Sequence, residues 1–375
     1  MSGKPDIVRI FFPERIQKKI TPLGSGKIND TWLVEFAGGG PAQAVLQRIN
    51  TRVFRQPEKI MANLRNLSRH LEKDIGPEPD HDADRWQTVT PYLTPGGQDL
   101  YRDGGGGVWR MLSFIDHASS FERVEGDGQA REVGRALGKF HRLTIDLDPA
   151  EFFDTLPGFH VTPQYLNRYD QIVTALKFIP GSAEEEFCAE FIEKNRTGVT
   201  VLEDAFTEGR LKRRIIHGDP KVSNIMLADD TGKAVGLVDL DTVKPGLLLY
   251  DLGDCFRSCC NPVGGGGGDL DSVRFDIEVF RSVLTGYLGE MGAYLADPEY
   301  DLLSRATGLI SFELGLRYFT DHLEGDHYFR VDAPGQNLNR AVGQFLLAAD
   351  ILRQDGELRD AVNSCRKFQR IHPSF

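Results

Sequence analysis

The sequence predicts an α+β protein with two unequal lobes, a small lobe rich in β-strands and a larger one that is mainly helical. Short apolar segments separated by glycine turns fill the first third of the chain, and segments with helical periodicity dominate after about residue 120. The length of 375 residues suggests about two domains at roughly 150 residues each. We therefore expect an N-terminal lobe at 1–115 and a C-terminal lobe at 116–375.

The small lobe is expected to be an antiparallel sheet with one main helix. Gly38 to Gly40 and Gly104 to Gly107 lie between apolar runs, which is typical of hairpin turns. Ile60 and Leu64 recur, with two further leucines, on one face of the predicted helix. The predicted strands are 20–23, 30–36, 43–49, 87–93 and 108–115, and the predicted helix is 57–73.

The large lobe is expected to be helical around a short strand-rich patch. Its predicted helices are 129–143, 183–207, 302–323 and 336–354, and the strand-rich patch is 214–241. The run Gly264 to Gly268 predicts a mobile surface loop rather than a phosphate-binding turn, because no strand immediately precedes it.

Composition excludes several classes of protein. The chain has 44 basic and 55 acidic residues, and a net charge of −11 argues against a nucleic-acid partner. Five cysteines without regular spacing argue against a secreted disulfide framework, and the cluster Cys255, Cys259 and Cys260 lacks a fourth zinc ligand. No signal peptide or run of about 18 apolar residues is recognisable, so we expect a cytoplasmic protein without a membrane partner. The oligomeric state stays open.

The most specific segment is a His-x-Asp-x-x-x-x-Asn motif that contains His217, Asp219 and Asn224. Fifteen residues later the chain reads Val-Asp-Leu-Asp, with Asp239 and Asp241. Phosphoryl transfer from ATP requires one carboxylate to orient and deprotonate a hydroxyl, and an amide oxygen and a second carboxylate to hold Mg²⁺. The spacing therefore indicates a kinase.

These motifs resemble the aminoglycoside phosphotransferase and choline kinase superfamily, which has a bilobal protein-kinase-like fold. The resemblance implies that Asp219 is the catalytic base and that Asn224 and Asp239 bind Mg²⁺. It also implies that Asp251 braces the catalytic loop, and that His217 has a structural role rather than acting as a base.

Four further segments resemble one branch of this superfamily, the N-acetylhexosamine 1-kinases, which phosphorylate the anomeric hydroxyl of N-acetylated sugars. They are 23–32, 45–50, 243–246 and 314–326. The resemblance covers roughly residues 15 to 350 and implies a sugar-like small-molecule acceptor. The sequence does not identify the sugar or show whether an acetamido group is required.

ATP is expected to lie between the lobes. The turn Gly24-Ser25-Gly26 would offer backbone N–H groups to the phosphates, with Lys27 and Asn29 as side-chain donors to phosphate or acceptor. Phe114 and Ile115 follow the last strand of the small lobe and resemble the hinge that reads adenine. Gly24 to Gly26 on their own are more often an ordinary hairpin.

The phosphate-binding lysine that protein kinases carry on their third strand is missing. Strand alternation places Gln47 at that position and Arg48 on the opposite face. Either a neutral pair of Gln47 with Asn63 replaces the usual ion pair, or Arg48 supplies the charge.

Acceptor binding is expected from polar residues in otherwise apolar surroundings. Glu313, Arg317 and Asp321 recur every four residues on one predicted helix, where they line the acceptor site or form a surface ladder of ion pairs. Asp241 lies two residues beyond Asp239, so an extended segment would point both carboxylates to the same side, toward metal or acceptor hydroxyls.

Other functions remain as alternatives. An aminoglycoside, choline or homoserine are rival acceptors, although Arg317 argues against a cationic one and no aromatic cage for choline is apparent from the spacing. The missing lysine is also compatible with a nucleotide-binding pseudokinase. The presence of Asp219, Asn224 and Asp239 together argues against that alternative.

Overall fold

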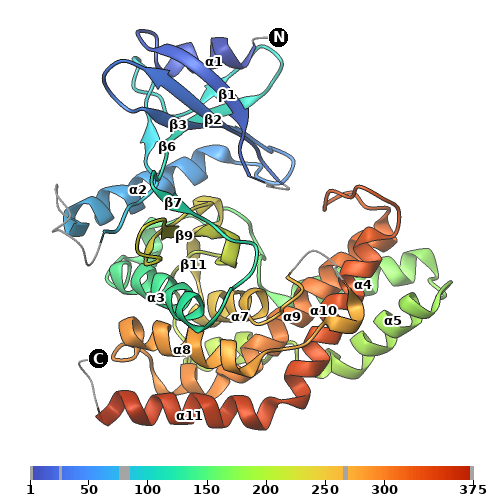
Figure 1. Cartoon of the computed structure of the whole chain (residues 1–375). Helices are drawn as coiled ribbons and strands as arrows, with labels where there is room; N and C mark the ends of the chain where they lie inside the picture. Colours follow the sequence, from blue (N-terminus) through green and yellow to red (C-terminus); the bar gives the residue numbers. More distant parts are fainter. Residues whose placement is uncertain (1–2, 25–27, 76–84, 265–268, 372–375) are drawn as a thin grey trace.

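The structure is a computed structural model that describes residues 3–24, 28–75, 85–264 and 269–371. It confirms the α+β class and consists of a small β-rich lobe above a larger helical lobe (Figure 1). The chain enters the large lobe after β6 (Val108–Ser113). The division at residue 115 stays a prediction, because the segment after α2 (Pro57–Ile75) also contacts the large lobe, where Gln87 N donates to Val235 O at 2.7 Å.

One antiparallel sheet forms the small lobe, in the order β1-β2-β3-β6-β4, with β5 also paired to β6. The β2–β3 hairpin turns at Gly38 and Gly40, whose positive φ angles of 79° and 84° suit glycine. The predicted strand at 87–93 shrinks to two residues because Gln87 pairs outside the sheet. The remaining strands are β1 (Ile16–Pro22), β2 (Asp30–Ala37), β3 (Gln43–Ile49), β4 (Pro91–Tyr92) and β5 (Tyr101–Arg102).

The two faces of this sheet differ in what covers them. On the outer face, α1 (Lys4–Phe11) buries Ile7 and Phe11 in a cluster with Leu46 of β3, and the sequence did not predict this helix. On the inner face, Leu112 of β6 joins the main core together with side chains of α2. Side chains of β3 and β6 alternate between the two faces of the sheet, and those on the inner face therefore point toward the large lobe.

The large lobe contains nine helices among the described residues, and α9 runs through its middle. The predicted helix 183–207 is interrupted, because α5 ends at Asn195 and a 3-10 turn at Arg196–Gly198 precedes α6. The sequence also missed α4, α7, α8 and α11. The helices are α3 (Asp127–Leu143), α4 (Thr162–Leu176), α5 (Ala183–Asn195), α6 (Val201–Thr207), α7 (Leu248–Cys259), α8 (Ile277–Met291), α9 (Asp297–Glu324), α10 (Gln336–Arg353) and α11 (Asp355–Ile371).

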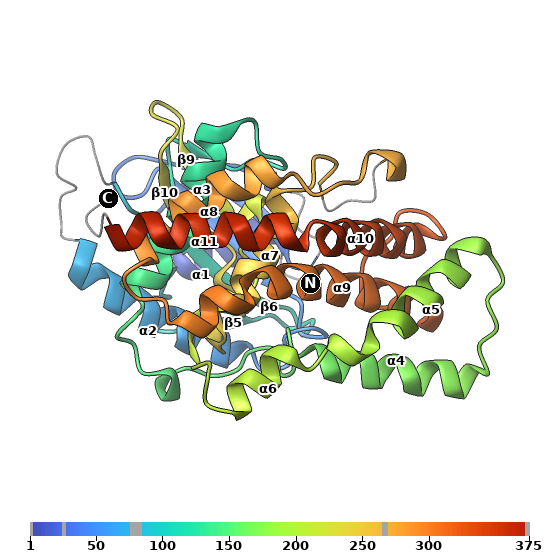
Figure 2. The same cartoon turned by 90° about the horizontal axis from the view of Figure 1, so that it is seen from below.

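Seen from below, α10 and α11 run across the underside of this lobe (Figure 2).

Two small sheets lie between the helices and the small lobe. One has the order β10-β9-β7 and the other pairs β11 with β8. Their strands are β7 (Ala118–Ser119), β8 (Arg214–Ile216), β9 (Ile225–Ala228), β10 (Ala234–Leu237) and β11 (Lys244–Gly246).

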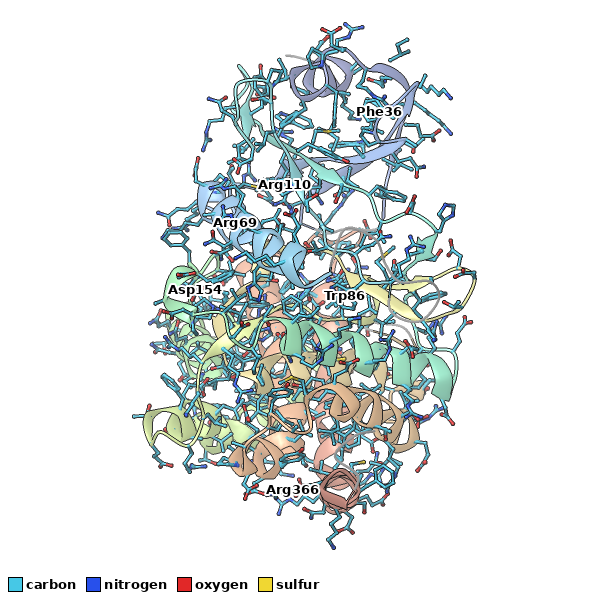
Figure 3. The ribbon with its side chains drawn as sticks, turned by 90° about the vertical axis from the view of Figure 1, so that its left-hand side faces the viewer. Phe36, Arg69, Trp86, Arg110, Asp154 and Arg366 are labelled. Atoms are coloured by element: carbon cyan, nitrogen blue, oxygen red, sulfur yellow. The ribbon has the colours of Figure 1, made fainter. Side chains whose placement is uncertain are left out.

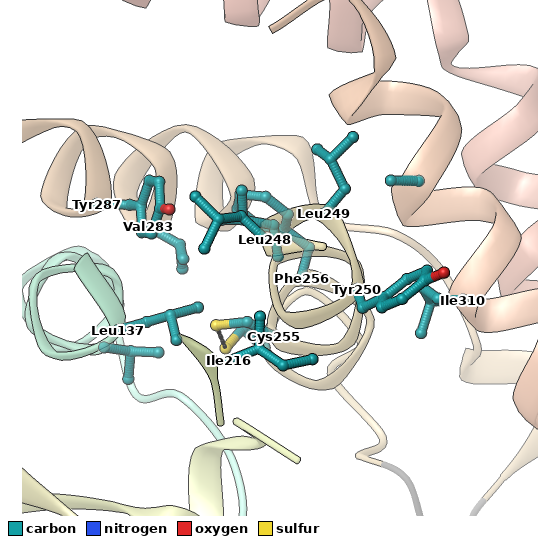
Figure 4. Packing of buried hydrophobic residues seen from close by; sticks show 14 of the residues in the cluster. Leu137, Ile216, Leu248, Leu249, Tyr250, Cys255, Phe256, Val283, Tyr287 and Ile310 are labelled. Atoms are coloured by element: carbon teal, nitrogen blue, oxygen red, sulfur yellow. Dashed lines mark hydrogen bonds between the residues drawn. The ribbon is translucent and has the colours of Figure 1, made fainter. Parts of the chain in front are cut away.

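Helix α7 is the centre of the main core. Figure 4 shows Phe256 of α7 with Leu137 and Tyr287 on one side and Ile310 on the other, and all four side chains are buried. Cys255 and Cys259 are buried on α7, and Cys260 follows its last turn. No helix in the described part of the chain is long and apolar enough to cross a bilayer.

Candidate active site

The loop between β8 and the 3-10 turn Val222–Asn224 carries the His-x-Asp motif, and α7 holds it in place. The backbone N–H groups of His217 and Gly218 donate to the Asp251 carboxylate at 2.7 and 2.8 Å. His217 Nε2 donates to Val238 O at 3.0 Å, and its Nδ1 accepts from Asp219 N. Burial lowers the pKa of His217, so the ring is neutral and supports the loop.

Asp251 is itself supported by a buried network that the sequence did not reveal. His141 Nε2 lies 2.9 Å from Asp251 Oδ2, and His141 Nδ1 lies 3.0 Å from the Tyr287 hydroxyl. Burial alone would raise the pKa of Asp251, but the hydrogen bond and charge of His141, together with His217 and the Gly218 N–H, outweigh it and lower the pKa. An ionised Asp251 on α7 therefore holds the His-x-Asp loop through the N–H groups of His217 and Gly218.

Asp219 is an ionised carboxylate with one oxygen available. Lys221 Nζ lies 2.5 Å from Asp219 Oδ2, and Asn224 Nδ2 donates to the same oxygen at 3.1 Å. Burial raises the pKa of Asp219, but the charge and hydrogen bond of Lys221, together with smaller contributions from His217 and Arg257, outweigh burial and hold the pKa below its usual value. Among the described residues no group donates to Oδ1, so this oxygen can accept a proton or a hydrogen bond.

Asn224 and Asp239 fit a magnesium site. The Asn224 amide nitrogen is used by Asp219, which leaves its oxygen, the metal-binding atom, without a donor among the described residues. Asp239 has a left-handed backbone (φ 61°) and no ion pair with a described residue. Asp239 is exposed at the surface. Its pKa is nevertheless raised to about 6, because the surrounding protein desolvates the carboxylate and the negative charges of Asp241 and Asp219 disfavour its ionisation.

Crowded carboxylates of this kind favour a cation. No three carboxylate, imidazole or thiol groups in the described ranges form a complete metal cage. Mg²⁺ is usually held by one or two carboxylates together with substrate phosphates, so Asn224 and Asp239 would suffice. Bound there, Mg²⁺ would neutralise phosphate charge.

Asp241 is placed differently from the expectation of an extended segment. Leu240–Thr242 is a 3-10 turn, which separates the side chains of Asp239 and Asp241. Asp241 is buried, and its Oδ1 accepts from Arg110 Nη2 at 2.5 Å while its Oδ2 accepts from Asn29 Nδ2 at 2.8 Å. Both donors come from the small lobe, so Asp241 joins the two lobes.

The expected replacements for the missing lysine are both wrong. Gln47 does not pair with Asn63, because Gln47 Oε1 accepts from Arg110 and Asn63 Nδ2 donates to the carbonyls of Phe153 and Val243. Arg48 is exposed on the opposite face of the sheet, where its guanidinium lies 5.8 Å from the Trp109 ring.

Of the expected nucleotide contacts, Gly24 has a left-handed φ of 72° with open space around it. Ser25, Gly26 and Lys27 lie outside the described residues. Half-buried Phe114 and buried Ile115 follow β6 as the chain leaves the small lobe. Asn29 also accepts from the Asn50 N–H at 2.9 Å, which fixes its side chain toward Asp241.

Neither carboxylate of the polar stripe on α9 is free for an acceptor. Glu313 is buried and is bonded to the His160 ring at 3.1 Å and to the Thr162 hydroxyl at 2.8 Å. Asp321 accepts from the backbone N–H groups of 327–329 and from Asn337. Both side chains organise the scaffold, which differs from the expected acceptor-binding role and from a surface ladder of ion pairs.

Arg317 lies between these two carboxylates on α9 but pairs with neither. Its guanidinium carbon sits 4.9 to 5.7 Å from the centres of four aromatic rings, and no described residue accepts a hydrogen bond from it. The rings belong to Phe159, Tyr165, Tyr328 and Phe329. Cation–π contacts hold the charge in place, and its N–H donors stay available.

This aromatic box, Arg317 and its four rings, adjoins the catalytic loop. Phe159 is followed by buried His160, whose Nε2 donates to the Gly218 carbonyl at 2.8 Å. Gly218 immediately precedes Asp219. Phe159 of the box is therefore next in the chain to a residue that contacts the loop carrying Asp219.

The family model of the phosphotransferase enzyme family matches residues 19–282 of the chain. This protein belongs to that family. The chain is also similar to an aminoglycoside phosphotransferase from Alicyclobacillus acidocaldarius, with 12% identity over 93% of each chain and a TM-score of 0.61. A microcompartment-associated aminopropanol kinase is 17% identical over 92% of this chain and 94% of the other, with a TM-score of 0.56.

A spectinomycin phosphotransferase, solved in complex with ADP and spectinomycin, is 12% identical over 90% of this chain and 93% of the other, with a TM-score of 0.53. At these identities the likeness supports the shared fold alone. The substrates in these names belong to those proteins.

Besides the His141 network, sequence reasoning missed Lys221, Arg110 and His160 in this phosphotransferase. Lys221 stands inside the recognised motif, so its position two residues after Asp219 was a usable signal. Arg110 and His160 have no such signal, because each lies far along the chain from its partner. Their contacts with Asp241 and Glu313 span 131 and 153 residues.

Proposed function

We propose that this phosphotransferase transfers the γ-phosphate of MgATP to a hydroxyl of a small, uncharged, sugar-like acceptor. The acceptor group we favour is the anomeric hydroxyl of an N-acetylhexosamine, on the resemblance carried by segments such as 314–326. ADP in the structure of a spectinomycin phosphotransferase of the same fold supports ATP as the donor.

Asp219 would act as the general base. Its free Oδ1 accepts the hydrogen bond of the attacking hydroxyl and takes the proton as the oxygen bonds to phosphorus. Lys221, at 2.5 Å from the other oxygen, holds the carboxylate in one orientation and ionised. Asn224 and Asp239 would hold Mg²⁺ against the phosphates.

The observation that carries the choice of acceptor is Arg317. A guanidinium with free donors would repel a cation, and the two nearest carboxylates, Glu313 and Asp321, are already satisfied by the protein. Sugar oxygens accept hydrogen bonds from a guanidinium, and the flat apolar face of a sugar ring packs well on aromatic rings. These properties favour a sugar over choline or an aminoglycoside.

The test is an ATP-consumption screen over free hexoses, N-acetylhexosamines, choline, homoserine and aminoglycosides. We expect turnover with an N-acetylhexosamine and none with the cationic acceptors. Turnover with a cation alone would refute the assignment of the acceptor. ATP binding without turnover on any of these acceptors would favour the pseudokinase.

Arg317→Ala should raise the acceptor KM at least tenfold and leave the KM for ATP within about twofold, because the box touches only the acceptor. Arg305→Ala provides a matched control, since Arg305 is exposed on the same helix. An unchanged acceptor KM in the Arg317 variant would contradict a role in acceptor binding.

Asp219→Asn should lower kcat by about 10² to 10⁴-fold, the usual contribution of a general base, with the Kd for MgATP nearly unchanged. The two quantities are measured by ADP release and by calorimetric titration. Full activity in this variant would refute the mechanism.

A further inference from the structure

The inner face of the small-lobe sheet carries a buried arginine beside the position where a protein kinase has its lysine. In the β3–β6 ladder, Gln47 is paired directly with Arg110. Side chains that face each other in this way lie on the same side of the sheet. Arg110 is only 1% exposed, and Figure 3 shows it where the small lobe meets the large one.

The contacts of Arg110 direct its charge toward Asp241 of the large lobe. Its Nε and Nη2 donate to Gln47 Oε1 at 3.0 and 2.7 Å, which fixes the guanidinium against β3. Its Nη2 also reaches Asp241 at 2.5 Å, and Asn29 Nδ2 donates to the other oxygen of the same carboxylate. Two donors from the small lobe thus converge on one anionic group next to Asp239.

We propose that Arg110 supplies from β6 the positive charge that binds the phosphates of ATP, in place of the lysine that β3 lacks. This inference rests on the proposed use of ATP. A buried cation is costly unless it is paired, so an anion must lie against Arg110 in every state. Asp241 fills that place in the structure, and phosphate oxygens would share the guanidinium with it when nucleotide enters.

The chemistry of the side chain suits this role. A guanidinium remains charged when buried and offers several donors in a fixed plane, which matches the oxygens of a phosphate. Gln47 explains why a lysine is not needed on β3, because its amide oxygen orients the arginine from the neighbouring strand.

The test compares binding of ATP, ADP and adenosine by calorimetry in the full-length protein. Arg110→Gln should weaken ATP and ADP at least tenfold and leave adenosine within about twofold, because only the phosphates contact the lost charge. Arg9→Gln is the control, since Arg9 is exposed on α1 of the same lobe and should change none of the three affinities.

A second variant moves the charge back to β3. Gln47→Lys combined with Arg110→Gln should recover most of the lost ATP affinity. If Arg110→Gln does not fold, Arg110→Lys keeps a charge and should still weaken ATP more than adenosine.

Equal weakening of ATP and adenosine would make Arg110 a purely structural residue and overturn the proposal, as would unchanged ATP binding. If the wild-type protein binds ATP and Arg110→Gln binds it with the same affinity, only the assignment of Arg110 is refuted. A wild-type protein that binds no ATP refutes the proposed function as well.

Discussion

At the scale of single residues, His160 has two acceptors and no donor as partners. Its Nδ1 faces the Glu313 carboxylate at 3.1 Å and its Nε2 faces the Gly218 carbonyl at 2.8 Å, so both nitrogens must carry protons. Burial lowers its pKa, but the charge of Glu313 and the hydrogen bond to it, together with smaller effects of Asp254 and the Gly218 carbonyl, outweigh burial and raise the pKa. The ring of Tyr250 stacks on His160 and adds no charge.

This arrangement predicts a pH dependence. Because the pKa in the folded state is raised above 6.5, the stabilisation is complete below about pH 6.5 and is lost as pH rises through the folded-state pKa. His160→Gln should therefore lower the free energy of unfolding by about 1.5–3 kcal/mol at pH 6 and by less at pH 9.

Denaturant unfolding at the two pH values measures this difference. His117→Asn is the control, because His117 is exposed and asparagine tolerates its left-handed backbone. A deficit that is the same at both pH values would contradict an imidazolium at position 160.

At the scale of helices and strands, α3 and α8 cross at contact distance through glycines. A Cβ atom at Gly134 would lie 1.8 Å from Val283 O, and one at Gly286 would lie 1.9 Å from Arg131 O. The contacting atoms belong to the backbone, so no side chain can move aside. This crossing positions His141 of α3 and Tyr287 of α8, which support Asp251.

Alanine substitutions test the crossing with opposite expected signs. Gly134→Ala should destabilise the protein by about 1–3 kcal/mol or more, because the helices must separate. Gly289→Ala, at an exposed position of α8 with open space around it, should stabilise by about 0.5–1 kcal/mol through helix propensity. Thermal unfolding of both variants gives the comparison, and a tolerated Gly134→Ala would contradict the close packing.

Helix α9 organises the aromatic box from one element. Glu313 fixes the segment that carries Phe159 and His160, and Asp321 fixes the segment that carries Tyr328 and Phe329. Each carboxylate lies one turn from Arg317 and brings aromatic rings onto it. The spacing of four residues therefore reflects how the two carboxylates hold the box around Arg317 through contacts within the protein.

At the scale of the whole molecule, three carboxylates meet where the lobes join. Asp219 is balanced by Lys221 and Asp241 by Arg110, whereas Asp239 has no cation of its own among the described residues. The chain has a net charge of −11, and the phosphates of ATP are negative as well. The uncompensated charge of Asp239 would therefore repel them unless a metal ion neutralises it.

Removal of Mg²⁺ should therefore weaken ATP binding by at least tenfold and leave adenosine binding unchanged. Calorimetric titrations with Mg²⁺ and with EDTA measure this. Asp239→Asn should reduce the difference between the two conditions, because it removes both the repulsion and the metal ligand. Equal ATP affinity with and without Mg²⁺ would contradict the metal site at Asp239.

The sequence by itself determined the α+β class, most of the antiparallel strands and the position of the His-x-Asp motif. Turn glycines, alternation and helical period are local, and the motif from His217 to Asp239 spans few enough residues for its spacing to be recognised. We did not predict the break in 183–207, although it falls at Arg196–Gly198 and Gly198 is a poor helix former.

Only the tertiary structure decided which polar side chains remain free. Strand alternation predicts that Gln47 and Arg48 lie on opposite faces, but only the fold shows that Gln47 contacts Arg110 and not Asn63. Glu313, Arg317 and Asp321 share one helix face, but the two carboxylates accept hydrogen bonds from the protein, whereas Arg317 donates none to a described residue. The physical reason is that a polar group is satisfied by whatever the fold brings within about 3 Å of it. Partners more than a hundred residues away leave no trace in local spacing.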